Sequence, residues 1–363
     1  MTSPAASGLW PDAARAQQFQ HWLAPLIAAH ALLPDTLAPA SSDASSRRYL
    51  RLRTQAGDSL IVMDAPASPN QVAPFVDVAS RMAAAGLHVP RLLAADAQAG
   101  FVLMEDLGPL SYLQALQQAQ HEGDAAAANR LMRQASQALL AWQRHGDATG
   151  LPEFDATFIA RELQIFVDWC VQAQFGRQWS PQQQAWWDRS VALLSREILA
   201  QPRVPMHRDF MPRNLMVGAN DRPGVLDFQD AVLGPVSYDI GSLLRDAFIS
   251  WDEAEELDWA IRYWEDARRA GLFGQGEEML EMGQDFGLFW RALEWTVLQR
   301  HLKILGIFCR LKLRDGKPGY AEDLPRFFAY AIKSASRYVE LAPLLRLLED
   351  LQPQLLQTGF SLR

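Results

Sequence analysis

Residues 204 to 230 constrain the fold of this chain more than any other stretch of it. They read VPMHRDFMPRNLMVGANDRPGVLDFQD. Three short apolar runs, VPM, LMV and GVL, predict buried strands, and the turn signal GAND separates the second run from the third. Polar residues stand at the ends of these runs: His207, Arg208, Asp209, Asn214 and Asp227. We therefore expect the scaffold to present these side chains to a ligand.

The spacing of three of these residues is typical of phosphoryl transfer. One carboxylate, Asp209, takes up or orients the proton of the acceptor hydroxyl, while Asn214 and Asp227 offer oxygen ligands to Mg²⁺ beside the nucleotide phosphates. The alternative is a chance His-Arg-Asp tripeptide followed by an unrelated strand end. For the tripeptide alone chance is favoured, but the three residues in register favour a functional site.

Length and composition fit a globular protein with two domains or lobes. The chain has 363 residues, of which 49% are hydrophobic and 21% charged. The two cysteines, Cys170 and Cys309, lie in apolar helical runs, which predicts buried thiols in a reducing cytoplasm. The formal net charge of −8 argues against a nucleic-acid partner. The N-terminal residues do not resemble a signal peptide, and no run of 18 uncharged apolar residues predicts a membrane span.

The first part of the chain reads as β-rich, after a helix over residues 11 to 30. Residues 33 to 40 are punctuated by prolines, and no strand is predicted there. Strands are predicted at 48–54, 59–64, 91–95 and 101–104, with a helix at 75–85. The small polar run at 41–46 is either a loop that folds over phosphates or an ordinary solvated loop, and taken alone it favours the latter. The strand that runs into Glu105-Asp106-Leu107-Gly108 marks a crossover between lobes.

From residue 109 onward the periodicities are helical, apart from the stretch at 204–230. Asp239 precedes a helix predicted at 240–248 and is expected to be its N-cap. A long helix is predicted at 284–313. Its apolar stripe is interrupted by six polar residues: Arg291, Glu294, Gln299, Arg300, His301 and Lys303. The pair Arg300 and His301 either reaches solvent or lines a polar pocket, with neither favoured.

The segments HRDFMPRN and VLDFQD resemble the catalytic loop and the metal-binding segment of the aminoglycoside phosphotransferase family. Helix and strand segments ending AAGLHVP and FVLMEDLG, and the later run GPVSYDIGSLLRD, follow the same order as in that family, so the resemblance covers most of the chain. It implies an α+β, protein-kinase-like fold of two lobes. The expected lobes are a small β-rich nucleotide-binding N-lobe at 1–107 and a larger, mainly helical C-lobe at 108–363 with the catalytic loop and the sugar site.

The runs SSDASSRRYLR, LIVMDAP and LQRHLKILGIFCRL are most similar to one group within that family, the amino-sugar kinases of bacterial cell-wall recycling. The resemblance implies an ATP- and Mg²⁺-dependent transferase that acts on a small-molecule amino sugar. The expected reaction converts N-acetylmuramate, N-acetylglucosamine or both to the sugar 1-phosphate at the anomeric hydroxyl, in peptidoglycan recycling. The expected protein is a cytoplasmic monomer that binds neither nucleic acid nor membrane.

The resemblance also assigns roles. It makes Asp209 the catalytic base and Asn214 and Asp227 the metal ligands, and it makes His207 a structural residue. The residues expected to contact the nucleotide are Ser45, Ser46, Arg47, Arg48, Glu105 and Leu107, with 105–107 as the hinge.

The chain departs from the family where the phosphates are bound. Members carry a Lys on the strand matched here by LIVMD, whereas this strand ends in Met63 and Asp64. The following helix has Asp77 in place of the usual Glu. Arg47 and Arg48 are the candidates that replace the missing cation.

An acceptor such as N-acetylmuramate carries a carboxylate, which an arginine can bind. The acceptor candidates are Arg213, Arg245, Arg300 and His301. Two alternatives stay open. A kinase for another hydroxyl compound, such as an aminoglycoside or an amino alcohol, would need an acidic pocket; the acidic segment at 251–259 is a candidate for it, but a solvated helix face is favoured there. A pseudokinase would bind nucleotide without turnover.

Overall fold

The computed structural model describes residues 9–40, 47–65, 72–218 and 222–357, with side chains as far as residue 351. The chain forms two compact units. The first contains Met1–Ala115 and Arg213–Asp230, and the second contains Leu116–Pro212 and Ala231–Arg363. The first is β-rich and the second mainly helical, so the predicted α+β class is confirmed. The assignment of nucleotide binding to 1–107 and of sugar binding to 108–363 stays a prediction.

The first unit contains a five-stranded antiparallel sheet with the order β1-β2-β3-β5-β4. Alternating apolar residues and tight turns, such as the one at 55–58, produce these strands. Two helices belong to the same unit: α1 (Ala13–Ala29) and α2 (Val72–Ala84). The strands are β1 (Leu32–Pro39), β2 (Arg48–Thr54), β3 (Ser59–Asp64), β4 (Leu92–Asp96) and β5 (Phe101–Glu105).

Strand β1 was not predicted, because Leu32–Pro39 reads as a loop. It lies at the edge of the sheet, where a proline does not interrupt a ladder on both sides. Its pairing with β2 shifts register between Leu33 and Ala38, so the strand is irregular as well. An edge position is a property of the whole sheet, which the local sequence does not reveal.

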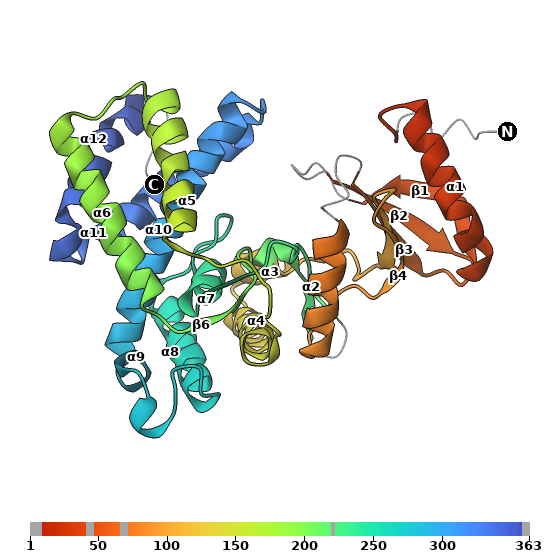
Figure 1. Ribbon diagram of the computed structural model, residues 1–363, viewed down its shortest axis with the longest axis horizontal. Coiled ribbons are helices and arrows are strands. Elements are labelled where there is room, and N and C mark those ends of the chain that lie inside the picture. Colours follow the sequence, from red (N-terminus) through yellow and green to blue (C-terminus); the bar gives the residue numbers. More distant parts are fainter. Residues whose placement is uncertain (1–8, 41–46, 66–71, 219–221, 358–363) are drawn as a thin grey trace. The chain divides into compact units, whose positions relative to one another are not determined.

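The sheet buries one face against α1, which lies alongside it in Figure 1. Phe19 and Leu23 of α1 pack on residues of four strands, and Trp22 stacks on Phe101 with ring centroids 5.1 Å apart. Arg15 also belongs to α1 and bonds to Asp64 at the end of β3. Both the apolar face and this ion pair therefore fix α1 on the sheet.

The hairpin predicted inside the 204–230 stretch is present in the first unit. It consists of β7 (Leu215–Met216) and β8 (Gly224–Val225), paired antiparallel. The Val217 amide donates to the carbonyl of Leu110 at 2.9 Å, and the Val225 amide donates to the carbonyl of His88 at 2.8 Å. The hairpin is thus held against the segments that precede β4 and follow β5.

The second unit is built around α10 (Phe286–Leu313), which confirms the long helix predicted at 284–313. Helices α5, α6, α7 and α11 pack on it, and Figure 1 shows α10 among them. Helix α3 (Tyr112–Glu122) begins in the first unit and ends in the second. The other α-helices and strands of the second unit are α4 (Ala125–His145), α5 (Ala156–Ile165), α6 (Pro181–Leu199), β6 (Arg203–Met206), β9 (Val232–Pro235), α7 (Ser237–Leu244), α8 (Glu253–Arg269), α9 (Glu281–Gln284), α11 (Leu324–Ser336) and α12 (Ala342–Gln357).

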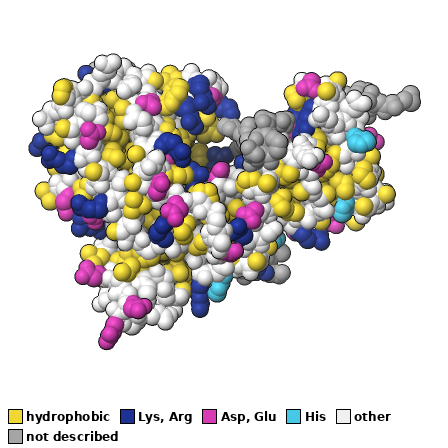
Figure 2. Space-filling view, viewed as in Figure 1, with side chains coloured by type: hydrophobic (Ala, Val, Ile, Leu, Met, Phe, Trp, Pro, Cys, Tyr) yellow, Lys and Arg dark blue, Asp and Glu magenta, His cyan; other side chains and the backbone are white. Residues whose placement is uncertain are grey.

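A π-helix, η3 (Phe166–Gln174), continues α5 and packs against α10. The close approach depends on Gly306, where a Cβ would lie 2.4 Å from the carbonyl oxygen of Ile165. Cys170 and Cys309 are both buried in this core as free thiols, as predicted. The face displayed in Figure 2 carries both acidic and basic side chains over the helical unit.

Candidate active site

The loop that follows β6 carries His207, Arg208 and Asp209 in the second unit. Strand β6 is buried and pairs with β9, so the start of the loop is fixed. Arg208 has a φ of 76°, in the left-handed region that side chains rarely adopt. The amides of His207 and Arg208 donate to the two carboxylate oxygens of Asp239, at 2.6 and 2.9 Å. Asp239 therefore acts as the anchor of this loop.

The prediction that Asp239 is a helix N-cap is wrong. Helix α7 begins at Ser237, three residues before the predicted start, and Asp239 lies in its first turn. Its carboxylate is fully buried and bonds to a loop that is 31 or 32 residues away in the chain. An Asp at the start of a helix reads as a cap from sequence, because a distant backbone partner leaves no local signal.

His207 is buried and bonds to the loop itself. Its Nδ1 accepts from the amide of Asp209 at 3.3 Å, and its ring lies edge-on to Phe210. This geometry agrees with the structural role that the family resemblance assigns to His207.

Asp209 is the accessible carboxylate of the loop, with 32% of its side chain exposed. Its Oδ1 lies 3.2 Å from Nη1 of Arg300. Burial acts to raise the pKa of Asp209, but the charges of Arg300, Lys303 and Arg208 outweigh burial and hold the pKa well below its usual range. Asp209 is therefore an ionised hydrogen-bond acceptor at neutral pH, suited to hold and orient a hydroxyl.

Helix α10 supplies the cations around Asp209. The polar residues predicted on this helix lie mainly in the interior, and the pair Arg300 and His301 is buried, so neither of these two side chains reaches solvent. Arg300 is 4% exposed and donates to the carbonyl of Arg208 at 3.0 Å as well as to Asp209. Glu294, Gln299, His301 and Lys303 are also buried, whereas Arg291 is only half-buried.

Two of the predicted acceptor residues have partners that hold them in the core. Arg245 is 3% exposed and contacts Glu256 and Glu294 at 3.1 and 3.0 Å. His301 donates from Nε2 to the carbonyl of Arg245 at 3.2 Å, because a carbonyl only accepts. These contacts favour a structural role for both side chains, and a contact of either with the acceptor stays a prediction.

Sequence reasoning did not single out Glu162 or Tyr238 and did not assign a function to Lys303. Glu162 on α5 contacts Arg208 at 3.2 Å and Lys303 at 2.9 Å. Tyr238 on α7 lies 3.4 Å from Nζ of Lys303. The interruption of the α10 stripe pointed to Lys303, but nothing near Glu162 in the sequence identifies its partners.

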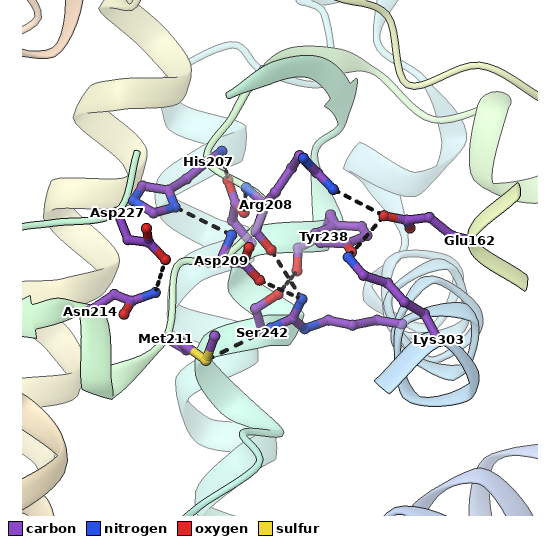
Figure 3. A network of polar contacts seen from close by, with 12 residues as sticks. Glu162, His207, Arg208, Asp209, Met211, Asn214, Asp227, Tyr238, Ser242 and Lys303 are labelled. Atoms are coloured by element: carbon purple, nitrogen blue, oxygen red, sulfur yellow. Dashed lines mark hydrogen bonds and ion pairs between the residues drawn. The ribbon is translucent and has the colours of Figure 1, made fainter. Parts of the chain in front are cut away.

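Asn214 and Asp227 flank the β7–β8 hairpin of the first unit. The amide of Leu226 donates to the carbonyl of Asn214 at 2.9 Å, and Nδ2 of Asn214 lies 3.4 Å from Oδ2 of Asp227 (Figure 3). Asp227 also has a left-handed backbone, with a φ of 61°. Arg213 precedes Asn214 in the same segment and is half-buried.

The donors in this segment fit a hard cation such as Mg²⁺. Asn214 and Asp227 offer amide and carboxylate oxygens, which this ion prefers. Gln229 donates from Nε2 to Oδ1 of Asp227 at 3.0 Å. The Oε1 of Gln229 is buried without a hydrogen bond from any described residue. A bound cation or its water would satisfy that oxygen.

Of the residues expected to contact the nucleotide, Ser45 and Ser46 lie outside the described part of the chain. Glu105 ends β5, and its Oε2 accepts from the Arg91 amide at 3.2 Å. Leu107 follows it within the first unit, where its side chain lies beside Gly224. Leu107 therefore packs against the hairpin that Asn214 and Asp227 flank.

At the end of β3, where the family resemblance implies a lysine, the chain has a carboxylate paired with arginines. Asp64 is fully buried and binds Arg15, with the closest contact at 2.5 Å, and also Arg48. Arg48 donates from Nη1 to the carbonyl of Leu9 at 2.6 Å, and 31% of its side chain is exposed. Asp77 pairs with Arg81 on its own helix. Arg47 is half-buried beside Arg48. The end of β3 thus carries an aspartate that binds two arginines, and it carries no lysine.

Together, a β-rich unit, a helical unit and an Asp–Asn–Asp segment define a phosphotransferase with a protein-kinase-like fold. The family model described as the phosphotransferase enzyme family matches residues 36–273. The chain therefore belongs to this family.

Two curated relatives match nearly the whole chain. The N-acetylmuramate/N-acetylglucosamine kinase of Pseudomonas aeruginosa is 45% identical over 348 residues, which cover 94% of this chain and 98% of the relative. The protein of the same name from Neisseria meningitidis serogroup B is 44% identical over 323 residues, which cover 89% of this chain and 92% of the relative.

Solved structures share the fold. The choline kinase LicA from Streptococcus pneumoniae superimposes with a TM-score of 0.55 at 10% sequence identity, covering 89% of this chain and all of that one. In the described part of the chain, no helix combines the length and the apolar character needed to cross a membrane.

Proposed function

We propose that this protein is an ATP-dependent kinase that phosphorylates N-acetylmuramate and N-acetylglucosamine. The observation that carries the proposal is the identity of 45% and 44% to two kinases of that name over almost their full lengths. The structure supports it with an ionised, accessible Asp209 surrounded by cations. We further propose that the product is the sugar 1-phosphate and that the reaction serves peptidoglycan recycling.

In the proposed reaction, Asp209 accepts a hydrogen bond from the anomeric hydroxyl of the sugar. That hydroxyl belongs to a hemiacetal and is more acidic than an ordinary alcohol, so a carboxylate with a low pKa is a sufficient acceptor for its proton. The hydroxyl oxygen attacks the γ-phosphorus, the bond from that phosphorus to the leaving ADP oxygen breaks, and the proton passes to Asp209. Positioning and charge stabilisation supply most of the rate in such a transfer.

Mg²⁺ would be held by Asn214 and Asp227, and its charge would neutralise the donor phosphates. Gln229 supports Asp227 through its hydrogen bond at 3.0 Å and keeps one carboxamide oxygen available. For the rest of the donor we propose hinge contacts at 105–107 and phosphate contacts by Arg47 and Arg48. The exposed part of Arg48 and its fixation by Asp64 support the latter.

On the acceptor side, the position of Arg300 beside Asp209 supports a role for its guanidinium at the reacting end of the sugar. We place the enzyme in the cytoplasm, because its two cysteines are buried free thiols, as in proteins of a reducing compartment. We also propose that it acts as a monomer.

A panel of acceptors tests the proposal. The purified protein is incubated with ATP and Mg²⁺ and, in turn, with N-acetylmuramate, N-acetylglucosamine, choline and an aminoglycoside, and ³¹P NMR identifies the phosphorylated oxygen. We expect an anomeric phosphate on the two amino sugars. Phosphate on the aminoglycoside alone would replace the proposal by an antibiotic kinase, and ADP release that no acceptor stimulates would favour a pseudokinase.

The role of Asp209 is tested by Asp209→Asn. This variant keeps the shape of the side chain but cannot accept the proton, so we expect kcat to fall by about 10²- to 10⁴-fold. The variant Asp188→Asn changes an exposed carboxylate whose partner is Gln184, and we expect it to keep the activity of the wild type. A kcat near that of the wild type in Asp209→Asn would exclude this carboxylate as the proton acceptor.

A further inference from the structure

A buried cluster next to Asp209 contains more positive than negative charge. Glu162 receives Lys303 at 2.9 Å and Arg208 at 3.2 Å, so one carboxylate meets two cations. Asp209 pairs with Arg300 at 3.2 Å. These five residues together carry three positive charges and two negative ones, and the neighbouring Asp239, whose pKa burial raises to about 7, adds only a partial negative charge at neutral pH. Figure 3 shows that Arg208 and Lys303 both contact Glu162.

Glu162, Lys303 and Arg208 of this cluster are shielded from water, whereas Asp209 is partly exposed. The exposed fractions of the side chains are 5% for Glu162, 8% for Lys303 and 19% for Arg208. Burial opposes the charged form of Glu162, yet the charges of Lys303 and Arg208 lower its pKa, so the carboxylate stays ionised. An excess charge in such a setting is costly unless an anion completes it.

The balance of positive and negative charge is different around Arg245, the other buried arginine predicted to bind the acceptor. There, Arg245 contacts two carboxylates, Glu256 and Glu294, and Glu294 also pairs with Arg337, so the charge of Arg245 is compensated without a further anion. Of these two clusters of described residues, the one beside Asp209 therefore has the excess of cations.

We propose that Lys303 and Arg208, held together by Glu162, bind the carboxylate of an anionic acceptor and so set the preference of the enzyme for N-acetylmuramate over N-acetylglucosamine. This inference rests on the proposed function, since it names the residues that distinguish its two acceptors. Asp209 holds the reacting hydroxyl and Arg208 is the next residue in the chain, so one acceptor can reach both.

The hydrogen-bond donors of Lys303 are arranged to suit a carboxylate. The ammonium of Lys303 has three N–H groups, and Glu162 and Tyr238 accept two of them. Gln299 donates to the second oxygen of Glu162 at 3.0 Å, which fixes the carboxylate that orients both cations. Lys303 and Arg300 lie three residues apart on α10 and share a face of the helix. Arg300 therefore serves the reacting end of the sugar, while Lys303 serves its acidic substituent.

The test compares the two sugars in variants at position 303. Lys303→Met removes the charge and keeps an apolar stem, and we expect the ratio of kcat/KM for N-acetylmuramate to kcat/KM for N-acetylglucosamine to fall by about 10- to 100-fold. Lys303→Arg keeps the charge, and we expect its ratio to stay within about threefold of the wild-type ratio. Lys312→Met makes the same change on the same helix at a residue that contacts Gln174, and we expect it to leave the ratio unchanged.

A binding measurement separates recognition from turnover. Calorimetry with each sugar, without nucleotide, should show that Lys303→Met loses affinity for N-acetylmuramate by the same factor and changes its affinity for N-acetylglucosamine far less. Equal losses for both sugars would overturn the proposal, because the cluster would then serve the phosphoryl group or the fold. So would a Lys303→Arg ratio as low as that of Lys303→Met. If the wild type phosphorylates neither sugar, the proposed function fails, and the calorimetric comparison still decides whether the cluster binds a carboxylate.

Discussion

At the scale of single residues, the candidate site contains backbone conformations that side chains rarely adopt. Among the described residues, the non-glycine positions with a positive φ are Ala31, Arg208 and Asp227, and two of these three lie in the site. Such conformations persist where surrounding contacts hold them. The carboxylate of Asp239 holds the loop at Arg208, and the bond from Leu226 to Asn214 holds the segment at Asp227.

Asp227 and Gln229 should differ in their effect on cation binding. We expect Asp227→Ala to abolish the binding of Mn²⁺, a paramagnetic substitute for Mg²⁺, because a carboxylate ligand is lost. Gln229→Ala should weaken it by about 10-fold or more, since Gln229 orients that ligand. Electron paramagnetic resonance of Mn²⁺ with a non-hydrolysable ATP analogue measures both effects. Asp58→Asn, an exposed carboxylate in a turn of the same unit, is the control. Unaltered Mn²⁺ binding in Asp227→Ala would remove this residue from the metal site.

At the scale of elements, the sequence predicts what is locally encoded. The β7–β8 hairpin and helix α10 follow from apolar periodicity and a turn signal, and both are present. Strand β1 could not be predicted, because its two prolines are tolerated only at the edge of a sheet. The π-helix η3, which packs against α10, could not be predicted either, since its apolar periodicity reads as an ordinary α-helix.

The contact of α10 with α5 and η3 depends on a single glycine. We expect Gly306→Ala to lower the free energy of unfolding by about 1–3 kcal/mol, because the new Cβ would lie 2.4 Å from the carbonyl oxygen of Ile165 and the backbone must shift. Gly319→Ala is a matched control, since a Cβ there has no described atom within 4 Å. Thermal denaturation followed by circular dichroism measures both variants. Equal stability of the two would mean that the helices separate at no cost.

At the scale of the whole molecule, the candidate site stretch at 204–230 is one segment of sequence but belongs to both compact units, which divide between Pro212 and Arg213. The spacing of Asp209, Asn214 and Asp227 was visible in the sequence because all three lie within one short stretch. The charges around Asp209 were only partly visible. Glu162 lies 46 residues before Arg208, and Arg300 lies 91 residues after Asp209, so only the fold brings them together.

Two buried groups give the folded molecule opposing dependences on pH. Burial, with the charges of Arg245 and Arg300, lowers the pKa of His301 from its ordinary value of 6.5 to about 3, although its bond to Arg245 acts to raise it. Burial raises the pKa of Asp239 from 3.8 to about 7, against the bonds from His207 and Arg208. Between pH 3 and 6.5 the unfolded chain binds a proton at His301 that the folded chain does not, so this contribution to stability rises with pH. Between pH 3.8 and 7 the folded chain keeps the Asp239 proton that the unfolded chain has lost, so that contribution falls with pH.

The contributions of His301 and Asp239 to stability overlap in pH and oppose each other. Comparing the wild type with a variant at one of these groups isolates the contribution of that group. We expect His301→Gln to be less stable than the wild type at neutral pH, because it alters a buried hydrogen bond to the Arg245 carbonyl. As the pH falls below 6.5, His301 of the unfolded wild type takes up a proton that the folded protein does not accept, and the wild type loses stability. The variant has no such group, so the difference in free energy of unfolding should shrink by about 1.4 kcal/mol for each unit of pH. Urea denaturation over a series of pH values measures the difference. A difference that is constant with pH would mean that the folded protein admits a proton at His301 as readily as the unfolded chain does.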